Sequence, residues 1–254
     1  MSDLYWLTNE QMERLRPFFP QSHGRPRVDD RYVLSGIILV NRNGLRWRDA
    51  PREYALHKTL YNRWKRWGAM GMGIFARRMD GLAAAKAQSQ TIMIDATYIK
   101  AYRTASSLRL KKGPPGRLIG RTKGGMNTKL HAVTDRNGHP LDFFMTGGQI
   151  SEYTGAAALL DSLPSAKWML ADRGYDADWF RDALEEKGIK PSIPGRKSRG
   201  KPIKYGKRKY KRRNRIEIMF GRLKDWRRVA TCYDRCPTVF FSAICLAATV
   251  ICWL

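Results

Sequence analysis

The chain has 254 residues, with 48 Lys and Arg against 22 Asp and Glu, which gives a formal net charge of +26. Hydrophobic residues make up 43% of it, enough for a packed core, which excludes wholesale disorder. So much positive charge repels itself in a compact fold. We therefore expect a polyanionic partner, nucleic acid before an anionic membrane surface.

The first seventy residues predict three short helices, in the segments 7–19, 29–44 and 57–71. In the first, Thr8 is placed as the N-cap with Gln11 three residues later, the pattern of a capping box. In the second, apolar residues recur at helical spacing between an Asp cap and an Asn-Gly stop. The third helix has an apolar stripe of Leu60, Trp64 and Trp67.

Cations occupy the other faces of that third helix. Successive short helices, the last of them basic and aromatic, suggest a helix-turn-helix-like DNA-binding region over residues 1–85. The alternative is that the three helices merely cover the main domain. The DNA contacts expected on the third helix are Lys58, Arg63, Lys65 and Arg66.

From Gln88 onward the pattern changes to short apolar runs that alternate with helical segments. The segment 125–148 holds two strand-like runs joined by Asn137-Gly138, a strong hairpin signal. Strands interleaved with helices predict an α/β domain with a mixed sheet over residues 86–254. A Pro/Gly/Lys-rich loop, "KPSIPGRKSRGKPIKYGKRK", is expected to become ordered around its ligand.

Two carboxylates stand in the same sequence context. Asp95 follows the apolar run "TIMI" and Asp172 follows "WMLA". Each is therefore expected on or at the end of a buried strand, where a charge is costly unless it binds something positive. The alternative for either one alone is that it caps a turn or a helix.

A third carboxylate, Glu217, lies in the highly basic segment Lys209–Arg228, which predicts a helix. Tyr210, Glu217 and Lys224 are seven residues apart and are expected to line one face. Arg213 lies one turn before Glu217, so a simple surface ion pair between the two is the alternative to a functional role. The apolar stripe of this helix is Ile216, Met219, Phe220, Leu223 and Trp226.

The last segment, 238–254, contains no charged residue. At 17 residues it is short for a membrane span of about 20, so we expect a buried core helix, with a tail anchor as the alternative. All four cysteines lie within residues 232–254 and are expected to be reduced thiols of a cytoplasmic protein rather than zinc ligands. The N-terminus lacks the pattern of a signal peptide.

Three carboxylates among so many cations point to metal chemistry on a phosphodiester. Asp95, Asp172 and Glu217 together can hold two Mg²⁺ ions through oxygen ligands. Two such ions roughly 4 Å apart stabilise the attacking and leaving oxygens of a phosphoryl displacement. The neighbouring cations would hold the DNA backbone, and they include Lys211, Arg212 and Arg215.

Three blocks, "MIDATYIKA", "LADRGYD" and "YKRRNRIEIMFGRLK", resemble those of DDE transposases from bacterial insertion sequences. The third fits the Y-x2-R-x3-E-x6-K signature of the insertion-sequence-four and insertion-sequence-five superfamily, as Tyr210, Arg213, Glu217 and Lys224. The N-terminal and central segments resemble the insertion-sequence-five group, so the likeness extends from about Leu7 to the C-terminus.

The resemblance implies a ribonuclease-H-like catalytic domain in which Asp95, Asp172 and Glu217 bind Mg²⁺, which Mn²⁺ can replace. Lys224, Tyr210 and Arg213 would contact the element's terminal DNA. The enzyme would hydrolyse a phosphodiester at the end of the element, and the freed 3′-OH would attack target DNA. The N-terminal helices would recognise the terminal inverted repeats.

We expect a homodimer on double-stranded DNA, because two element ends must be brought together. We expect it in the bacterial cytoplasm, associated with the nucleoid and not with a membrane. Two alternatives to the transposase function stay open. One is a metal-dependent nuclease that never joins strands, and the other is a non-catalytic DNA-binding protein.

Overall fold

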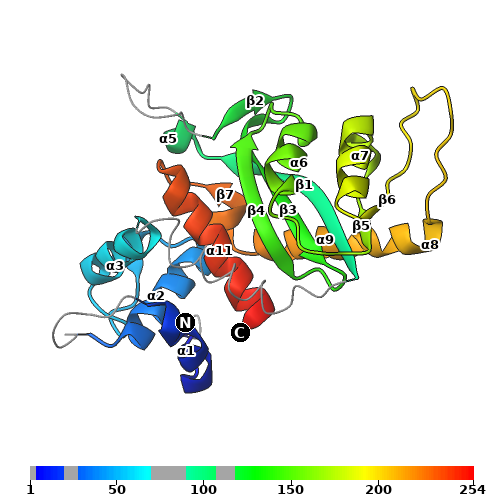
Figure 1. Cartoon of the computed structure of the whole chain (residues 1–254). Coiled ribbons are helices and arrows are strands. Elements are labelled where there is room, and N and C mark those ends of the chain that lie inside the picture. Colours follow the sequence, from blue (N-terminus) through cyan, green and yellow to red (C-terminus); the bar gives the residue numbers. More distant parts are fainter. Residues whose placement is uncertain (1–3, 20–27, 70–89, 107–117) are drawn as a thin grey trace. The chain divides into compact units, whose positions relative to one another are not determined.

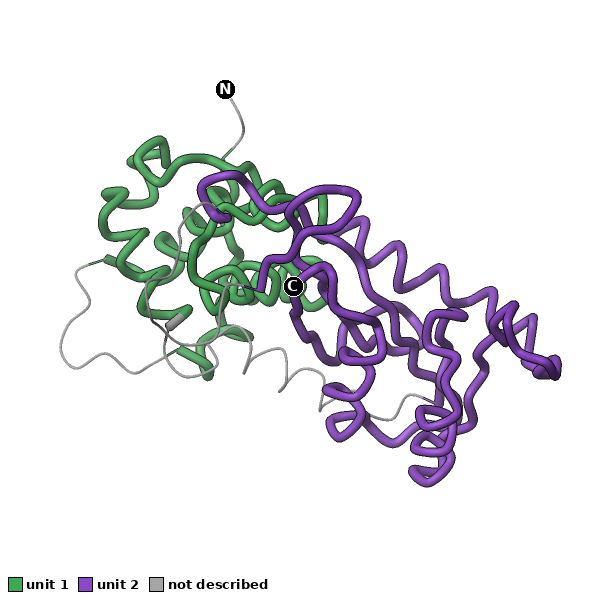
Figure 2. Tube along the Cα trace, turned by 90° about the horizontal axis from the view of Figure 1, so that it is seen from above, with its two compact units in different colours: residues 1–78, 223–254 green, residues 79–222 purple. Residues whose placement is uncertain are grey.

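A computed structural model describes residues 4–19, 28–69, 90–106 and 118–254. The chain forms two compact units, Met1–Arg78 with Leu223–Leu254, and Met79–Arg222 (Figure 2). The predicted boundary between residues 85 and 86 lies outside the described residues.

The first unit contains the three predicted N-terminal helices. α1 (Asn9–Leu15) begins with the expected capping box between Thr8 and Gln11. α2 (Asp30–Asn43) starts at an Asp cap and ends at Gly44, whose φ of 69° is the left-handed conformation that glycine favours. The predicted apolar stripe of α3 (His57–Ala69) is buried. Short 3-10 turns follow α1 and α2, namely η1 (Arg16–Phe18) and η2 (Trp47–Asp49).

The C-terminal segment belongs to this same unit. α10 (Arg227–Ala230) packs on α2, and α11 (Pro237–Trp253) packs on both α2 and α3. The predicted burial of the uncharged segment is thus confirmed. The compact units group this segment with the N-terminal helices, while the domain bounds 1–85 and 86–254 stay a prediction. An apolar helix must cover an apolar surface, and α2 and α3 supply that surface. None of the described helices is long and apolar enough to cross a membrane. All four cysteines are free thiols, and β7 (Thr231–Cys232) lies between α10 and α11.

A mixed sheet forms the centre of the second unit, as predicted. Its strands run in the order β2-β3-β1-β5-β6, and β4 pairs with β3 (Figure 1). The pairs β1–β3, β2–β3 and β3–β4 are antiparallel, and the pairs β1–β5 and β5–β6 are parallel. The hairpin between β3 and β4 turns at Gly138, whose φ is 88°. The strand bounds are β1 (Thr91–Ala101), β2 (Gly120–Thr122), β3 (Gly125–Asp135), β4 (Pro140–Gly147), β5 (Trp168–Leu170) and β6 (Lys190–Ser192).

Helices pack against this sheet. α6 (Glu152–Leu160) lies on β3 and β4, and α7 (Asp178–Glu186) contacts β6 and α6 (Figure 1). Their apolar sides enclose a core with β1 and β5, in which Ile92, Met169 and Phe180 are fully buried. The shorter pieces are α5 (Arg103–Ser106) and the 3-10 turn η3 (Arg173–Tyr175).

The single helix predicted over Lys209–Arg228 is interrupted. The structure has α8 (Lys207–Tyr210), a 3-10 turn η4 (Lys211–Arg213) and then α9 (Asn214–Lys224). Because a 3-10 turn rotates about 20° more per residue than an α-helix, the three residues of η4 move Tyr210 about 60° off the face that the seven-residue spacing predicts. The predicted apolar stripe of the helix is buried as expected.

Candidate active site

The parallel pair of β1 and β5 places the first two carboxylates. In its register Ile92 lies beside Met169, and Met93 lies beside Leu170. Asp95 and Asp172 each come two residues after Met93 and Leu170, so they stand at the same level along the sheet and on the same face. Asp95 is within β1, and Asp172 lies just past the end of β5, after Ala171, as the sequence predicts.

Asp95 is a partly buried carboxylate with few hydrogen-bond donors around it. Its side chain is 14% exposed, and its Oδ1 accepts one hydrogen bond, from the amide of Ala96 at 2.9 Å. Burial raises its pKa to about 6, although Arg213 and the Ala96 amide act in the opposite direction. The nearby negative charges of Asp172 and Glu152 raise the pKa further. A carboxylate in this state is stabilised by any additional cation.

Asp172 also caps the turn that follows it. Its Oδ1 accepts a hydrogen bond from the amide of Gly174 at 2.7 Å, which begins the 3-10 turn η3. The capping role that was the alternative interpretation of this aspartate is therefore present. It occupies Oδ1, and it fixes the orientation of the whole carboxylate beside Asp95.

Arg213 joins the third carboxylate to the first. Its Nη1 donates to Oδ2 of Asp95 and its Nη2 donates to Oε1 of Glu217, both at 2.5 Å. The predicted ion pair with Glu217 is thus real, but it is one half of a bridge that reaches the sheet. Arg213 is 17% exposed and Glu217 is 54% exposed, so the bridge runs from the core of the unit to its surface.

The three predicted ligands do not close around one point. In the described ranges no group of three or more Asp, Glu, His or Cys side chains is close enough to hold a metal ion. The guanidinium of Arg213 lies between Asp95 and Glu217, where it supplies the positive charge. The chemistry of the donors nevertheless fits Mg²⁺, because all three are carboxylates, the oxygen ligands that this ion prefers.

A fourth carboxylate, which the sequence analysis missed, belongs to this group. Glu152 is the first residue of α6, and its pKa is raised by burial and by the charge of Asp172. A Cβ on Gly174 would stand 2.2 Å from Oε2 of Glu152 and 2.8 Å from Oδ1 of Asp172. A side chain at position 174 would therefore push the Glu152 carboxylate away from its place beside Asp172. The sequence shows merely an acid in a first helical turn, which the helix dipole explains.

Basic residues of η4 and α9 flank the site. Lys211, Arg212 and Arg215 are exposed, and the last two line a cleft with Arg136 and Asn137. Tyr210 packs edge-on against Tyr205, with the rings 5.5 Å apart. Lys224 is exposed at the end of α9, two turns beyond Glu217.

The cations predicted to contact DNA from α3 differ in their exposure and in their contacts. Lys58, Lys65 and Arg66 are exposed. Arg63 instead forms an ion pair with Asp30 and lies 5.6 Å over the ring of Trp67. That arginine is committed to contacts inside its own unit, because its charge joins α3 to the first turn of α2.

Two family descriptions match this chain. "Transposase DDE domain" matches residues 86–253, and "Putative transposase of IS4/5 family" matches residues 7–75. The chain is 36% identical over 131 residues to a putative transposase for insertion sequence element IS6501 of Brucella ovis, covering 51% of this chain and 99% of that protein. It is 30% identical over 153 residues to a putative transposase for insertion sequence element IS402 of Burkholderia cepacia. That match covers 53% of this chain and 70% of that protein.

Among solved structures, a piggyBac transposase synaptic complex with hairpin DNA is similar over 94% of this chain and 68% of that chain. The TM-score is 0.50 and the identity is 8%, so the likeness concerns the fold alone. It confirms the predicted α/β fold, a ribonuclease-H-like mixed sheet flanked by helices.

Proposed function

From the premise that this chain belongs to the family of DDE transposases, a family of enzymes, we propose that it acts on the ends of an insertion sequence. It cleaves double-stranded DNA at the terminal inverted repeats in a Mg²⁺-dependent reaction, and Mn²⁺ can replace Mg²⁺. The freed 3′-OH end is then transferred to target DNA. The two ends are held by a homodimer.

One observation carries this function: the register of β1 and β5 puts Asp95 and Asp172 side by side, and Arg213 connects Asp95 to Glu217. Asp95, Asp172 and Glu217 are the residues that would hold the metal ions. When bound, two Mg²⁺ ions would supply charge stabilisation to the attacking and leaving oxygens of the phosphodiester.

The cations of the chain bind and orient the DNA. Arg213 offers the carboxylates a counter-charge in the free chain, and its planar guanidinium suits a DNA phosphate once a metal ion supplies that charge. Tyr210 and Lys224 contact the terminal DNA on either side of Glu217. The remaining backbone contacts are assigned to Lys211, Arg212 and Arg215.

Recognition of the inverted repeats is assigned to residues 1–85, and catalysis to residues 86–254. Lys58, Lys65 and Arg66 are the exposed cations of α3 that support this assignment. Arg63 contributes by holding α3 in place through Asp30.

The test is cleavage of linear DNA that carries the element's own terminal repeats, with Mg²⁺. Wild type is compared with Asp95→Asn, Asp172→Asn and Glu217→Gln, and each variant is also tested for DNA binding. Asp142→Asn is the matched control, because Asp142 is another partly buried carboxylate of the sheet that accepts a bond from the next amide, Phe143 N, at 2.7 Å.

We expect wild type and Asp142→Asn to cut at the repeat boundary, while the other three variants bind DNA without cutting it. If those three variants cut as wild type does, the assigned carboxylates are wrong. A pre-cleaved end offered with target DNA distinguishes a transposase from a nuclease that never joins strands. DNA binding with no cleavage by any form would favour a non-catalytic DNA-binding protein.

A further inference from the structure

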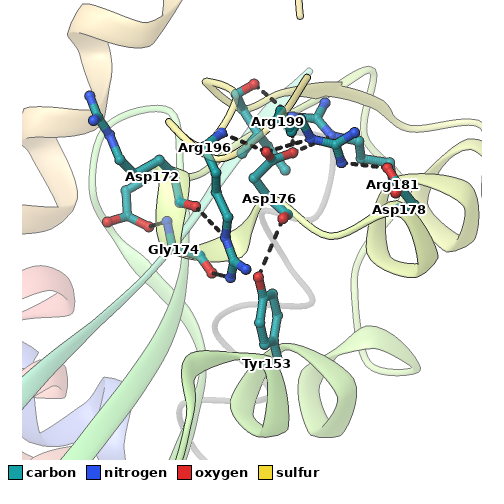
Figure 3. Close-up of polar contacts among 10 residues, drawn as sticks. Tyr153, Asp172, Gly174, Asp176, Asp178, Arg181, Arg196 and Arg199 are labelled. Carbon is teal, nitrogen blue, oxygen red and sulfur yellow. Dashed lines mark hydrogen bonds and ion pairs between the residues drawn. The ribbon is translucent and has the colours of Figure 1, made fainter. Parts of the chain in front are cut away.

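A second acidic centre lies four residues after Asp172. The side chain of Asp176 is fully buried, with 0% exposed. Its Oδ1 accepts from Nε of Arg181 at 2.9 Å, and its Oδ2 accepts from the Arg196 amide and from Nε of Arg199, both at 2.7 Å (Figure 3). Burial alone would raise the pKa of Asp176, but the hydrogen bonds from Arg199, Arg196 and Arg181 lower it below its ordinary value.

Two of these donors come from the basic loop, residues 194–206, which connects β6 to α8 (Figure 1). The loop has no carboxylate of its own, so its charges repel one another and an ordered form needs an outside anion. Asp176 supplies a buried anion to the Arg199 side chain, and Asp178 is a second, exposed one. The cations of the loop are Arg196, Lys197, Arg199, Lys201 and Lys204.

The loop is also tied to the turn that carries Asp172. Nη2 of Arg196 donates to the carbonyl of Gly174 at 3.2 Å, while the amide of Gly174 donates to Asp172 (Figure 3). The Arg196 guanidinium lies 4.7 Å from the ring centre of Tyr153, whose hydroxyl donates to the Asp176 carbonyl at 3.3 Å. One glycine thus connects the loop to a carboxylate of the active site.

The start of the loop is clamped from α7. Nη2 of Arg181 donates to the carbonyl of Ile193 at 2.8 Å. Arg199 has a second partner in Asp178, which is 78% exposed. Arg181 and Arg199 therefore hold the loop in place, whereas the side chains of Lys197, Lys201 and Lys204 are exposed along it.

We propose that Asp176 is a positioning residue that fixes the basic loop beside Asp172, so that its exposed lysines bind the phosphates of duplex DNA in a fixed register with the active site. This inference rests on the proposed function, because it takes the element's DNA as the ligand. Asp176 does not touch the reacting atoms. It acts through Arg196 and Arg199, whose contacts set the distance between the loop and the carboxylates.

The test is photo-crosslinking of the full chain, without divalent metal, to duplex DNA carrying the terminal repeat. A photoreactive nucleotide is placed in turn at each position around the repeat boundary, and the crosslinked peptide is identified by mass spectrometry. The variants are Asp176→Asn and Arg199→Gln, since the latter changes a more exposed residue and keeps the buried carboxylate. The matched control is Asp178→Asn, which removes only the exposed partner of Arg199.

In wild type and Asp178→Asn we expect residues 194–206 to crosslink from one or two adjacent positions. In Asp176→Asn and Arg199→Gln the yield at those positions should fall about tenfold, the effect of losing a charge-assisted hydrogen bond, and spread to neighbouring positions. Thermal unfolding identifies a variant that fails to fold, in which case Arg199→Gln alone decides.

The inference is overturned if the wild-type loop does not crosslink at all, or if a folded Arg199→Gln gives the wild-type pattern. Registered crosslinking by a chain that never cuts DNA with Mg²⁺ would leave the loop assignment intact and contradict only the proposed chemistry.

Discussion

Asp95, which is partly buried, and Asp176, which is fully buried, are arginine-paired carboxylates of the same unit, yet their pKa values shift in opposite directions. Asp176 receives hydrogen bonds on both oxygens from Arg181, Arg196 and Arg199, and its pKa is lowered. Asp95 has one amide and one arginine, which it shares with Glu217, and its pKa is raised to about 6.

The difference separates a structural charge from a charge that is ready for a ligand. Asp176 has its protein partners in place, so an added cation would gain little there. Asp95 lies beside two other carboxylates, Asp172 and Glu152, and has too few donors. A site of that kind is stabilised by what binds to it, which is the electrostatic condition for a metal centre.

The sharpest way to break the comparison is to remove one charge from the site. Asp95→Asn or Asp172→Asn should lower the rate of Mg²⁺-dependent cleavage at least about a thousandfold, because several kcal/mol of charge stabilisation are lost. Single-turnover cleavage at saturating DNA measures this rate. A loss below tenfold in both variants would contradict the assignment of these residues.

For the free energy of unfolding we expect the opposite order, with a larger loss for a change at Asp176 than for a change at Asp95. Asp176→Asn should cost about 3–5 kcal/mol in the free energy of unfolding, because it leaves three donors, two of them charged, around a neutral side chain. Asp95→Asn should change that free energy by less than about 1 kcal/mol, since it removes a charge that was already costly and Arg213 keeps Glu217. Urea unfolding of the two variants tests the contrast, which equal losses would disprove.

A variant of Glu152 tests whether this carboxylate contributes to metal binding or only lies near the site. If its carboxylate helps to hold the metal beside Asp172, Glu152→Gln should weaken Mn²⁺ binding by about 10–100-fold, the range seen for groups that support metal ligands. Calorimetry measures the affinity without any need for cleavage. Glu185→Gln, an exposed glutamate at the end of α7, should leave it unchanged.

The smallest expected effect is on pH dependence. Because the pKa of Asp95 in the folded chain is about 6, the residue is protonated below that pH and must lose its proton before it can bind a metal. Mn²⁺ affinity should therefore fall by up to about tenfold per unit as the pH drops below 6. Asp95→Asn should bind more weakly at every pH and lose most of this dependence.

The same shift has the opposite sign for stability. A raised pKa means that the folded state binds the Asp95 proton more tightly than the unfolded state does. Its contribution is therefore fully present at low pH and is lost as the pH rises to about 6.

Local patterns predicted those parts of the site that depend on neighbouring residues. An apolar run before Asp95 and another before Asp172 were enough to place both at strands, and the spacing of Arg213 and Glu217 was enough to pair them. The Arg213 contact with Asp95 spans 118 residues, and no local pattern reports such a distance. Glu152 was missed for the same reason, since its proximity to Asp172 and Asp95 comes from the packing of segments far apart in the sequence.

One feature of the fold was mispredicted and another was predicted only in part, each for its own physical reason. No glycine or proline marks the 3-10 turn within Lys211–Arg213, so the segment read as one helix. The uncharged segment 238–254 correctly predicted burial, but hydrophobicity is not directional and could not name α2 and α3 as the surface that it covers.

Because α11 packs on α2 and α3, the N-terminal unit can complete its core only late in synthesis. The helices α2 and α3 leave the ribosome long before α11 is synthesised. At typical synthesis speeds the interval is on the order of ten to thirty seconds. During that time their apolar faces are open to chaperones and to aggregation. A premature stop codon after Lys224 would leave every assigned catalytic residue in the product. It would still remove α11, the helix that packs on α2 and α3.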